Sequence, residues 1–357
     1  MKLFQCQHCN LLLFFENRVC TGCGHTLGYL PVENELTALE AAGNNRWQTL
    51  ALNGNQSVFC KNAEYDACNW LIPADSPEPF CIACRHNRTV PNLSQHANMD
   101  YWRKMEFAKH RLSYTLLRLH LPTPNRTDDP NQGLAFDFLD DPPQGKVITG
   151  HDNGIITLAL KEADDTKRVA LRNAMHEPYR TLLGHFRHEI GHYYWDRLIK
   201  DENRQNECRA LFGDDTQDYA AALKRHYEQG APADWQQRFV SAYATSHPWE
   251  DFAETWAHYL HIVDSLETAG AFGIAVDIPS LPGQPVSAKT HIKPYDKGDF
   301  AQLIETWLPL TYAMNSMNRS MGLKDIYPFV LSDEVIRKLS FIHNLVHAPR
   351  VALLSAA

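Results

Sequence analysis

The sequence lacks any apolar run that approaches the about 20 residues needed to cross a membrane. The apolar run from Leu11 to Phe15 is too short for the core of a signal peptide and lies between cysteines. Positive charge is also scarce, because the chain has 34 Lys and Arg but 42 Asp and Glu, which gives a net charge of −8. We therefore expect a cytoplasmic protein that binds neither membranes nor, nonspecifically, nucleic acid, which requires a basic surface.

Cysteine is nearly absent from most of the chain, since only Cys208 lies beyond Cys84, whereas eight of the nine cysteines come earlier. In a cytosolic chain, such clustered cysteines indicate metal binding more often than disulfides. The change in composition divides the 357 residues into an N-terminal domain of residues 1–95 and a second domain of residues 96–357.

The N-terminal cysteines form two quartets, each of which predicts a structural zinc site. The first has the regular zinc-ribbon spacing and consists of Cys6, Cys9, Cys20 and Cys23. The second is less regular and consists of Cys60, Cys68, Cys81 and Cys84. A mixed ligand set that includes His8 or His86, or free core cysteines, is the alternative for the second quartet. With six Lys and Arg against eight Asp and Glu, we expect this domain to bind a protein partner or cover the active site.

The second domain is predicted to be α+β, with a small sheet followed by helices. Apolar residues recur at helical spacing from about residue 99 to residue 120. Three short segments have strand-like patterns, at residues 134–139, 147–149 and 155–160. Asn153-Gly154 predicts a tight turn between the last two. The Pro- and Gly-rich residues 271–299 predict a long loop.

Residues 188–192, His-Glu-Ile-Gly-His, predict a helix that carries two zinc-binding histidines. Residues four apart lie on one helical face, so the imidazoles of His188 and His192 can reach one ion. Glu189 is placed to take a proton from zinc-bound water and return it to the leaving amine. We expect Pro178 to start this helix. An amphipathic helix with surface histidines is the alternative interpretation.

A catalytic zinc ion also needs a third protein ligand and an open position for water. Two carboxylates four residues apart, Glu250 and Glu254, begin 58 residues after His192 and would share a helical face. One could bind the metal, while the other accepts the N–H of a ligand histidine. The neighbouring Phe252 and Trp256 predict a buried helix rather than a solvated acidic edge, and buried carboxylates need partners.

The two motifs together resemble the gluzincin group of zinc peptidases, which includes thermolysin and anthrax lethal factor. The likeness rests on residues 188–192 and on Glu-Asp-Phe-Ala-Glu at residues 250–254. It implies that Glu250 is the third zinc ligand and that Glu254 orients a ligand histidine. It also implies that Tyr243, seven residues before Glu250, stabilises the oxyanion. An ordinary half-buried tyrosine is the alternative for this residue.

Over nearly its whole length, the chain is similar to a bacterial family of zinc-binding metallopeptidases with an N-terminal zinc ribbon. Besides the cysteine region, the segments that carry this likeness are residues 149–154, 162–165 and 177–195. The resemblance implies a zincin-like catalytic domain over residues 96–357, but it implies no particular substrate.

We therefore expect a zinc-dependent endopeptidase that acts on a protein or peptide, with one catalytic and two structural zinc ions. Its substrate would add as a strand to a sheet edge, which we place at residues 155–160. The alternatives are a scaffold protein whose zinc sites are all structural and a nucleic-acid-associated regulatory protease. Glu189 argues against the scaffold, because a structural zinc site has no need of this acid.

Overall fold

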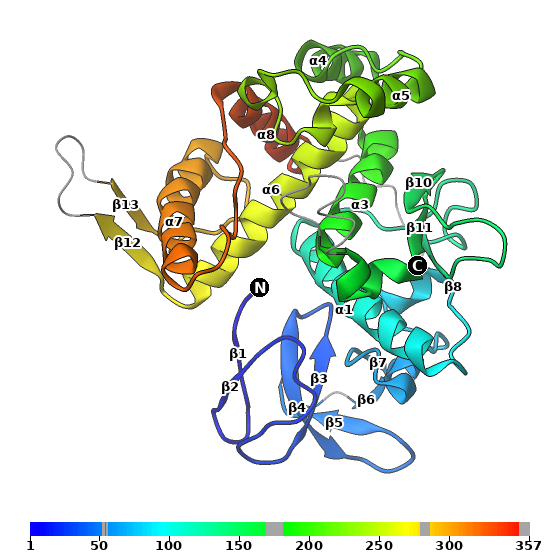
Figure 1. The fold of residues 1–357 in the computed structure, drawn as a ribbon. Helices are drawn as coiled ribbons and strands as arrows, with labels where there is room; N and C mark the ends of the chain where they lie inside the picture. The colour runs from blue at the N-terminus through cyan, green and yellow to red at the C-terminus, as the bar shows by residue number, and fades with distance from the viewer. Residues whose placement is uncertain (52–53, 55, 169–180, 279–285, 350–357) are drawn as a thin grey trace.

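The computed structural model describes residues 1–51, 54, 56–168, 181–278 and 286–349 (Figure 1). Pro178, the expected start of the motif helix, lies outside these residues. The described chain is α+β, as predicted, with small sheets in its N-terminal part and mostly helices after them. None of the described helices is long and apolar enough to cross a membrane.

The N-terminal region consists of short antiparallel strands around the cysteine quartets. Strand β1 (Phe4–Gln5) pairs with β2 (Leu12–Leu13) beside the first quartet. A five-stranded sheet in the order β3-β4-β5-β6-β7 follows. Its strands are β3 (Thr26–Leu30), β4 (Glu35–Ala41), β5 (Trp47–Thr49), β6 (Gln56–Phe59) and β7 (Leu71–Pro73).

Helix α1 (His96–Arg118) joins the N-terminal region to the rest of the molecule (Figure 1). Aromatic rings of the N-terminal region contact this helix. The ring of Phe15 lies edge-on to that of Tyr114, with 5.4 Å between their centroids, and the ring centroids of Trp70 and His110 lie 5.0 Å apart. Helix α1 also contacts the motif helix α3. Because one buried apolar cluster runs through both parts of the chain, the domain division at residue 95 stays a prediction.

A four-stranded sheet in the order β10-β11-β9-β8 lies beside the motif helix. Its strands are β8 (Asn87–Thr89), β9 (Ala135–Leu139), β10 (Gly150–Asp152) and β11 (Ile155–Ala159). The expected turn lies between β10 and β11, where Asn153 and Gly154 have φ values of 47° and 86°. Our placement of the sheet edge at residues 155–160 is wrong, because β11 pairs with β9 on one side and β10 on the other.

The motif helix α3 (Leu182–Leu198) packs closely on helix α6 (Pro248–Ala271). Thr181 caps α3 by accepting a hydrogen bond from the backbone N–H of Gly184. At Gly191, a Cβ atom would lie 2.9 Å from Cα of Ala253, closer than real Cβ atoms come. Glycine at this position therefore allows the two helices to approach each other.

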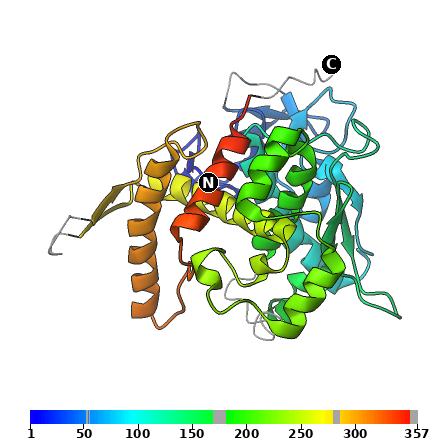
Figure 2. The same ribbon diagram turned by 90° about the horizontal axis from the view of Figure 1, so that it is seen from above.

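The remaining described α-helices and strands are α4 (Glu202–Phe212), α5 (Tyr219–Gln229), β12 (Ala275–Ile278), β13 (Val286–Lys289), α7 (Phe300–Ser320) and α8 (Asp333–Val346). Of these, helices α4, α7 and α8 contact α6, and the β12–β13 ribbon contacts α7. Our prediction of one long loop over residues 271–299 is wrong in part, because β12 and β13 pair as an antiparallel ribbon. Figures 1 and 2 both place this ribbon and α7 at one side of the molecule, away from the β10–β11 sheet.

Candidate active site

Three predicted ligands from α3 and α6 converge in the structure. The Nε2 atoms of His188 and His192 lie 3.2 Å apart. Oε2 of Glu250, in the first turn of α6, lies 3.0 Å from His188 Nε2 and 3.5 Å from His192 Nε2. Donors on a tetrahedral zinc ion, at bond lengths near 2.1 Å, stand about 3.4 Å apart. The spacing of these three atoms therefore fits one zinc ion.

Hydrogen bonding also prepares this cluster for a metal ion. Nδ1 of His188 donates to Oε1 of Glu254 at 2.8 Å, which leaves the Nε2 lone pair of His188 for a metal. Glu254 also accepts a hydrogen bond from Ser241 at 2.6 Å. Among the described residues, no donor with hydrogen-bond geometry reaches Oε2 of Glu250, although this atom is buried. A cation would satisfy this buried oxygen atom.

The electric field of the cluster likewise favours a cation. Burial lowers the pKa of His188, but the neighbouring carboxylates of Glu250 and Glu254 outweigh it and raise this pKa well above its usual range. Burial also raises the pKa of Glu189, and the histidine charges only partly oppose this effect. Glu189 is therefore a stronger proton acceptor than an exposed glutamate.

Tyr243 lies at the same site, on a short turn before α6, with its ring centroid 5.9 Å from that of His188. Burial raises the pKa of its phenol, so the hydroxyl stays protonated. His247, a second side chain near the site that could donate to an oxyanion, is engaged elsewhere. Its Nδ1 caps α6 by accepting the backbone N–H of Trp249, and its Nε2 lies 3.2 Å from the carbonyl oxygen of Gln217.

Tyr219, which the sequence did not indicate, contacts the proposed third ligand directly. Its hydroxyl, at the start of α5, donates to Oε1 of Glu250 at 2.6 Å. This bond leaves Oε2 of Glu250 free to face the two histidines. Nothing in the local sequence separates Tyr219 from any other tyrosine, because the contact depends on how α5 packs on α6.

Aromatic rings enclose the second histidine. The ring centroid of Trp249 lies 3.8 Å from that of His192, and the ring centroid of His151, on β10, lies 6.4 Å from it. Nε2 of His151 accepts the backbone N–H of Gly154 at 2.9 Å. Burial, and then the charge of His192, lower the pKa of His151 to about 3, so this ring stays neutral. The hydrogen bond therefore closes the turn after the edge strand β10, and the ring of His151 lies beside the motif helix.

Both cysteine quartets have zinc-like geometry. In the first, Sγ of Cys6 lies 3.6 Å from that of Cys23, and Cys9 lies 3.5 Å from Cys20. In the second, the four Sγ atoms lie within 4.8 Å of one another. Zn–S bonds of about 2.3 Å place tetrahedral sulfur ligands about 3.8 Å apart. His86, an alternative ligand of the second quartet, instead donates its Nδ1 hydrogen to the carbonyl of Leu134.

Two cysteine quartets and a His–His–Glu cluster define a zinc-binding protein. Residues 98–345 match a family model described as "Putative zinc-binding metallo-peptidase", and residues 3–95 match a zinc-ribbon domain. The chain therefore belongs to this zinc-binding metallopeptidase family and carries an N-terminal zinc ribbon.

Relatives that match the chain over nearly its whole length occur in mycobacteria. Uncharacterized proteins of Mycobacterium tuberculosis and Mycobacterium bovis are each 43% identical to the chain over 351 residues. The matches cover 97% of this chain and 95% of each relative. No solved structure matches the chain.

Proposed function

We propose that this protein is a gluzincin-type peptidase that hydrolyses peptide bonds of a protein or peptide substrate with Glu189 as general base. The observation that carries the proposal is the number of donors at the site. His188, His192 and Glu250 form the cluster, and no fourth His, Cys, Asp or Glu among the described residues joins them. Structural zinc sites have four protein ligands, whereas three protein ligands leave a position for water.

A bound zinc ion would supply Lewis acidity toward a water molecule and the scissile carbonyl. The remaining steps belong to side chains of this protein. Glu189, with its raised pKa, takes a proton from the water and passes it to the leaving nitrogen. Tyr243 keeps its phenolic proton and donates a hydrogen bond to the carbonyl oxygen as negative charge develops there.

The edge strand β10 is the proposed binding surface for the substrate backbone. Among the described strands, β10 pairs with β11 alone, and it contacts α3, the helix that carries both histidines. An extended peptide could add to this edge through main-chain hydrogen bonds. Because the ring of His151 on β10 lies 6.4 Å from that of His192, centroid to centroid, an added strand would pass beside the proposed ligand cluster.

Glu189→Gln tests the catalytic role, because it removes the base and keeps the shape of the side chain. The variant should bind as much zinc as the wild type, yet cleave an unfolded protein substrate at least about 100-fold more slowly. Glu202→Gln, an exposed substitution on α4, is the matched control and should cleave normally. Equal cleavage by Glu189→Gln and the wild type would refute the proposal.

Zinc stoichiometry tests the metal site separately from activity. Elemental analysis of the wild type should give about three zinc ions per chain, one at each proposed site. The His188→Ala/Glu250→Ala double variant should hold about two. If the folded wild type holds two and the double variant loses none, the cluster on α3 and α6 does not bind zinc.

A further inference from the structure

The second cysteine quartet lies where the N-terminal region meets helix α1. All four of its cysteines are buried. His110, a buried residue of α1, directs Nε2 toward the quartet, 3.3 Å from Sγ of Cys68 and 3.5 Å from Sγ of Cys84. His110 forms a close group with Cys84 and Glu106 rather than with the whole quartet, which places it at one edge of the four sulfurs.

The direction of these contacts follows from the other ring nitrogen. Nδ1 of His110 lies 2.6 Å from the backbone oxygen of Glu106 and therefore donates, because a carbonyl oxygen only accepts. Zinc-bound cysteines are thiolates, which also only accept. A favourable contact between Nε2 and the two sulfurs consequently requires an N–H at Nε2 as well.

The charges around the quartet favour the same arrangement. Four thiolates and one Zn²⁺ carry a net charge of about −2, which is costly to bury without nearby positive groups. Lys109, which is fully buried, bonds both oxygens of Glu106, and Oε2 of Glu106 lies 3.5 Å from Sγ of Cys84. The charge of Lys109 lies close to Glu106 and also to Cys84 and Cys81, whereas His110 is the residue of α1 whose ring nitrogen contacts the sulfur atoms directly.

We propose that His110 is an N–H donor to the zinc-bound thiolates of Cys68 and Cys84, so that the N-terminal region and helix α1 build the second zinc site together. Removal of this zinc ion would then loosen α1 from the N-terminal region. The proposal is independent of the peptidase activity, because it involves no residue of the His188 cluster.

Site-resolved alkylation of the full-length zinc-loaded protein tests this role. Peptide mass spectrometry after timed alkylation gives a rate for each cysteine, and the first quartet serves as an internal reference. In His110→Ala, Cys68 and Cys84 should react about tenfold faster or more, because hydrogen bonds to charged acceptors are strong. His110→Gln, which keeps an N–H donor, should recover part of the protection.

The control is His86→Ala, which removes another buried histidine beside the quartet that bonds Leu134 instead of sulfur. Equal acceleration in His86→Ala and His110→Ala would overturn the proposal, as would unchanged rates in His110→Ala. A wild-type measurement covers the case in which His110→Ala does not fold. Cadmium-113 NMR should detect a coupling between the metal and an imidazole N–H, and its absence at the second site would also overturn the proposal.

Discussion

Replacement of Glu254 by glutamine should weaken zinc binding at the cluster without altering any of the three proposed ligands. Burial raises the pKa of Glu254, but its hydrogen bond from His188 and the charge of that ring outweigh burial and lower the pKa to about 2. The carboxylate is therefore ionised at neutral pH. Glu254→Gln keeps an acceptor for His188 Nδ1 and removes the negative charge.

The magnitude follows from the type of hydrogen bond that is lost. A hydrogen bond to a charged group contributes about 1.5–3 kcal/mol, against about 0.5–1.5 kcal/mol for a neutral one. The midpoints of these ranges differ by about 1.3 kcal/mol, which corresponds to a little under tenfold in zinc affinity. Losses of about 10–100-fold are typical when the hydrogen-bond partner of a ligand histidine is replaced. The two arguments agree on a loss of about tenfold for Glu254→Gln.

Competition with a fluorescent zinc chelator measures this affinity while the cysteine sites stay loaded. Glu228→Gln, an exposed substitution on α5, is the control and should match the wild type. Ser241→Ala removes the second hydrogen bond to Glu254, together with the one that Ser241 Oγ accepts from the backbone N–H of Ala244, and should have a smaller effect on zinc affinity than Glu254→Gln. If Glu254→Gln binds zinc within about twofold of the wild type, the proposed support of His188 by Glu254 is refuted.

Tyr219→Phe should lower zinc affinity at the cluster by about tenfold, because it removes the hydrogen bond that orients Glu250. Tyr227→Phe, at an exposed position of α5, is the control and should leave zinc affinity unchanged in the same assay. Gly191→Ala should cost about 1–3 kcal/mol of unfolding free energy by forcing α3 from α6, and Gly150→Ala, with open space around its Cβ, should not. Denaturant unfolding measures both. The raised pKa of His188 means that zinc displaces a proton there, so zinc affinity should rise from pH about 6 to about 8. An affinity that does not change with pH contradicts this prediction.

The parts of the site that the sequence could predict are those set by spacing within one element. His188 and His192 are four residues apart, as are Glu250 and Glu254, and helix geometry places the members of each pair on one face. The first cysteine quartet is similar, because each Cys-x₂-Cys knuckle is a local turn. Such patterns predict which donors lie together, whatever the rest of the chain does.

The contributions of other elements could not be predicted, because they depend on packing between segments far apart in the sequence. Tyr219 reaches Glu250 from α5, and His110 reaches the second quartet from α1. The edge strand beside the motif helix, β10, was not predicted as the sheet edge for a related reason. Strand β10 has only three residues, so its alternating pattern is too short to distinguish it from the flanking loop.

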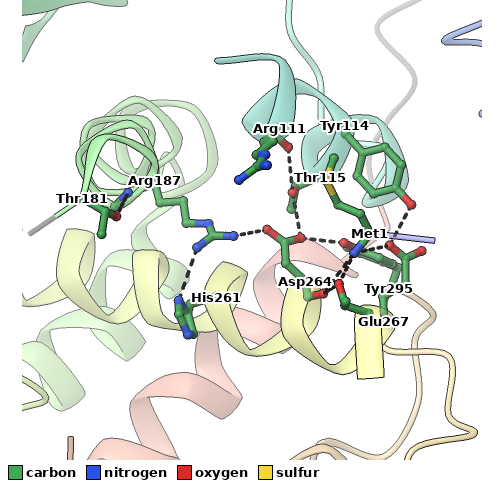
Figure 3. A network of polar contacts seen from close by, with 12 residues as sticks. Met1, Arg111, Tyr114, Thr115, Thr181, Arg187, His261, Asp264, Glu267 and Tyr295 are labelled. Carbon is green, nitrogen blue, oxygen red and sulfur yellow. Dashed lines mark hydrogen bonds and ion pairs between the residues drawn. The ribbon is translucent and has the colours of Figure 1, made fainter. Parts of the chain in front are cut away.

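Beyond the ligand cluster, the relative placement of α1, α3 and α6 depends on a buried polar network (Figure 3). Arg187, the residue before His188, bonds Asp264 of α6. Asp264 also accepts hydrogen bonds from Thr115 of α1 at 2.7 Å and from Tyr295 at 2.5 Å. A shared acceptor of this kind restrains the rotation of all three helices at once, because the loss of any donor would leave a buried carboxylate less well hydrogen-bonded and would destabilise the fold.

This arrangement separates two requirements of the proposed catalysis. Glu250 lies in the first turn of α6, where the helix dipole stabilises a negative charge, so its carboxylate is favoured even before a metal ion binds. Glu189 belongs to α3, and its pKa is raised chiefly by burial, while the charges of His188 and His192 act in the opposite direction. Zinc affinity therefore depends on the contacts between α3 and α6, whereas the strength of the base depends on how well the site excludes water. Variants that open the site without moving the helices should consequently lose cleavage before they lose zinc.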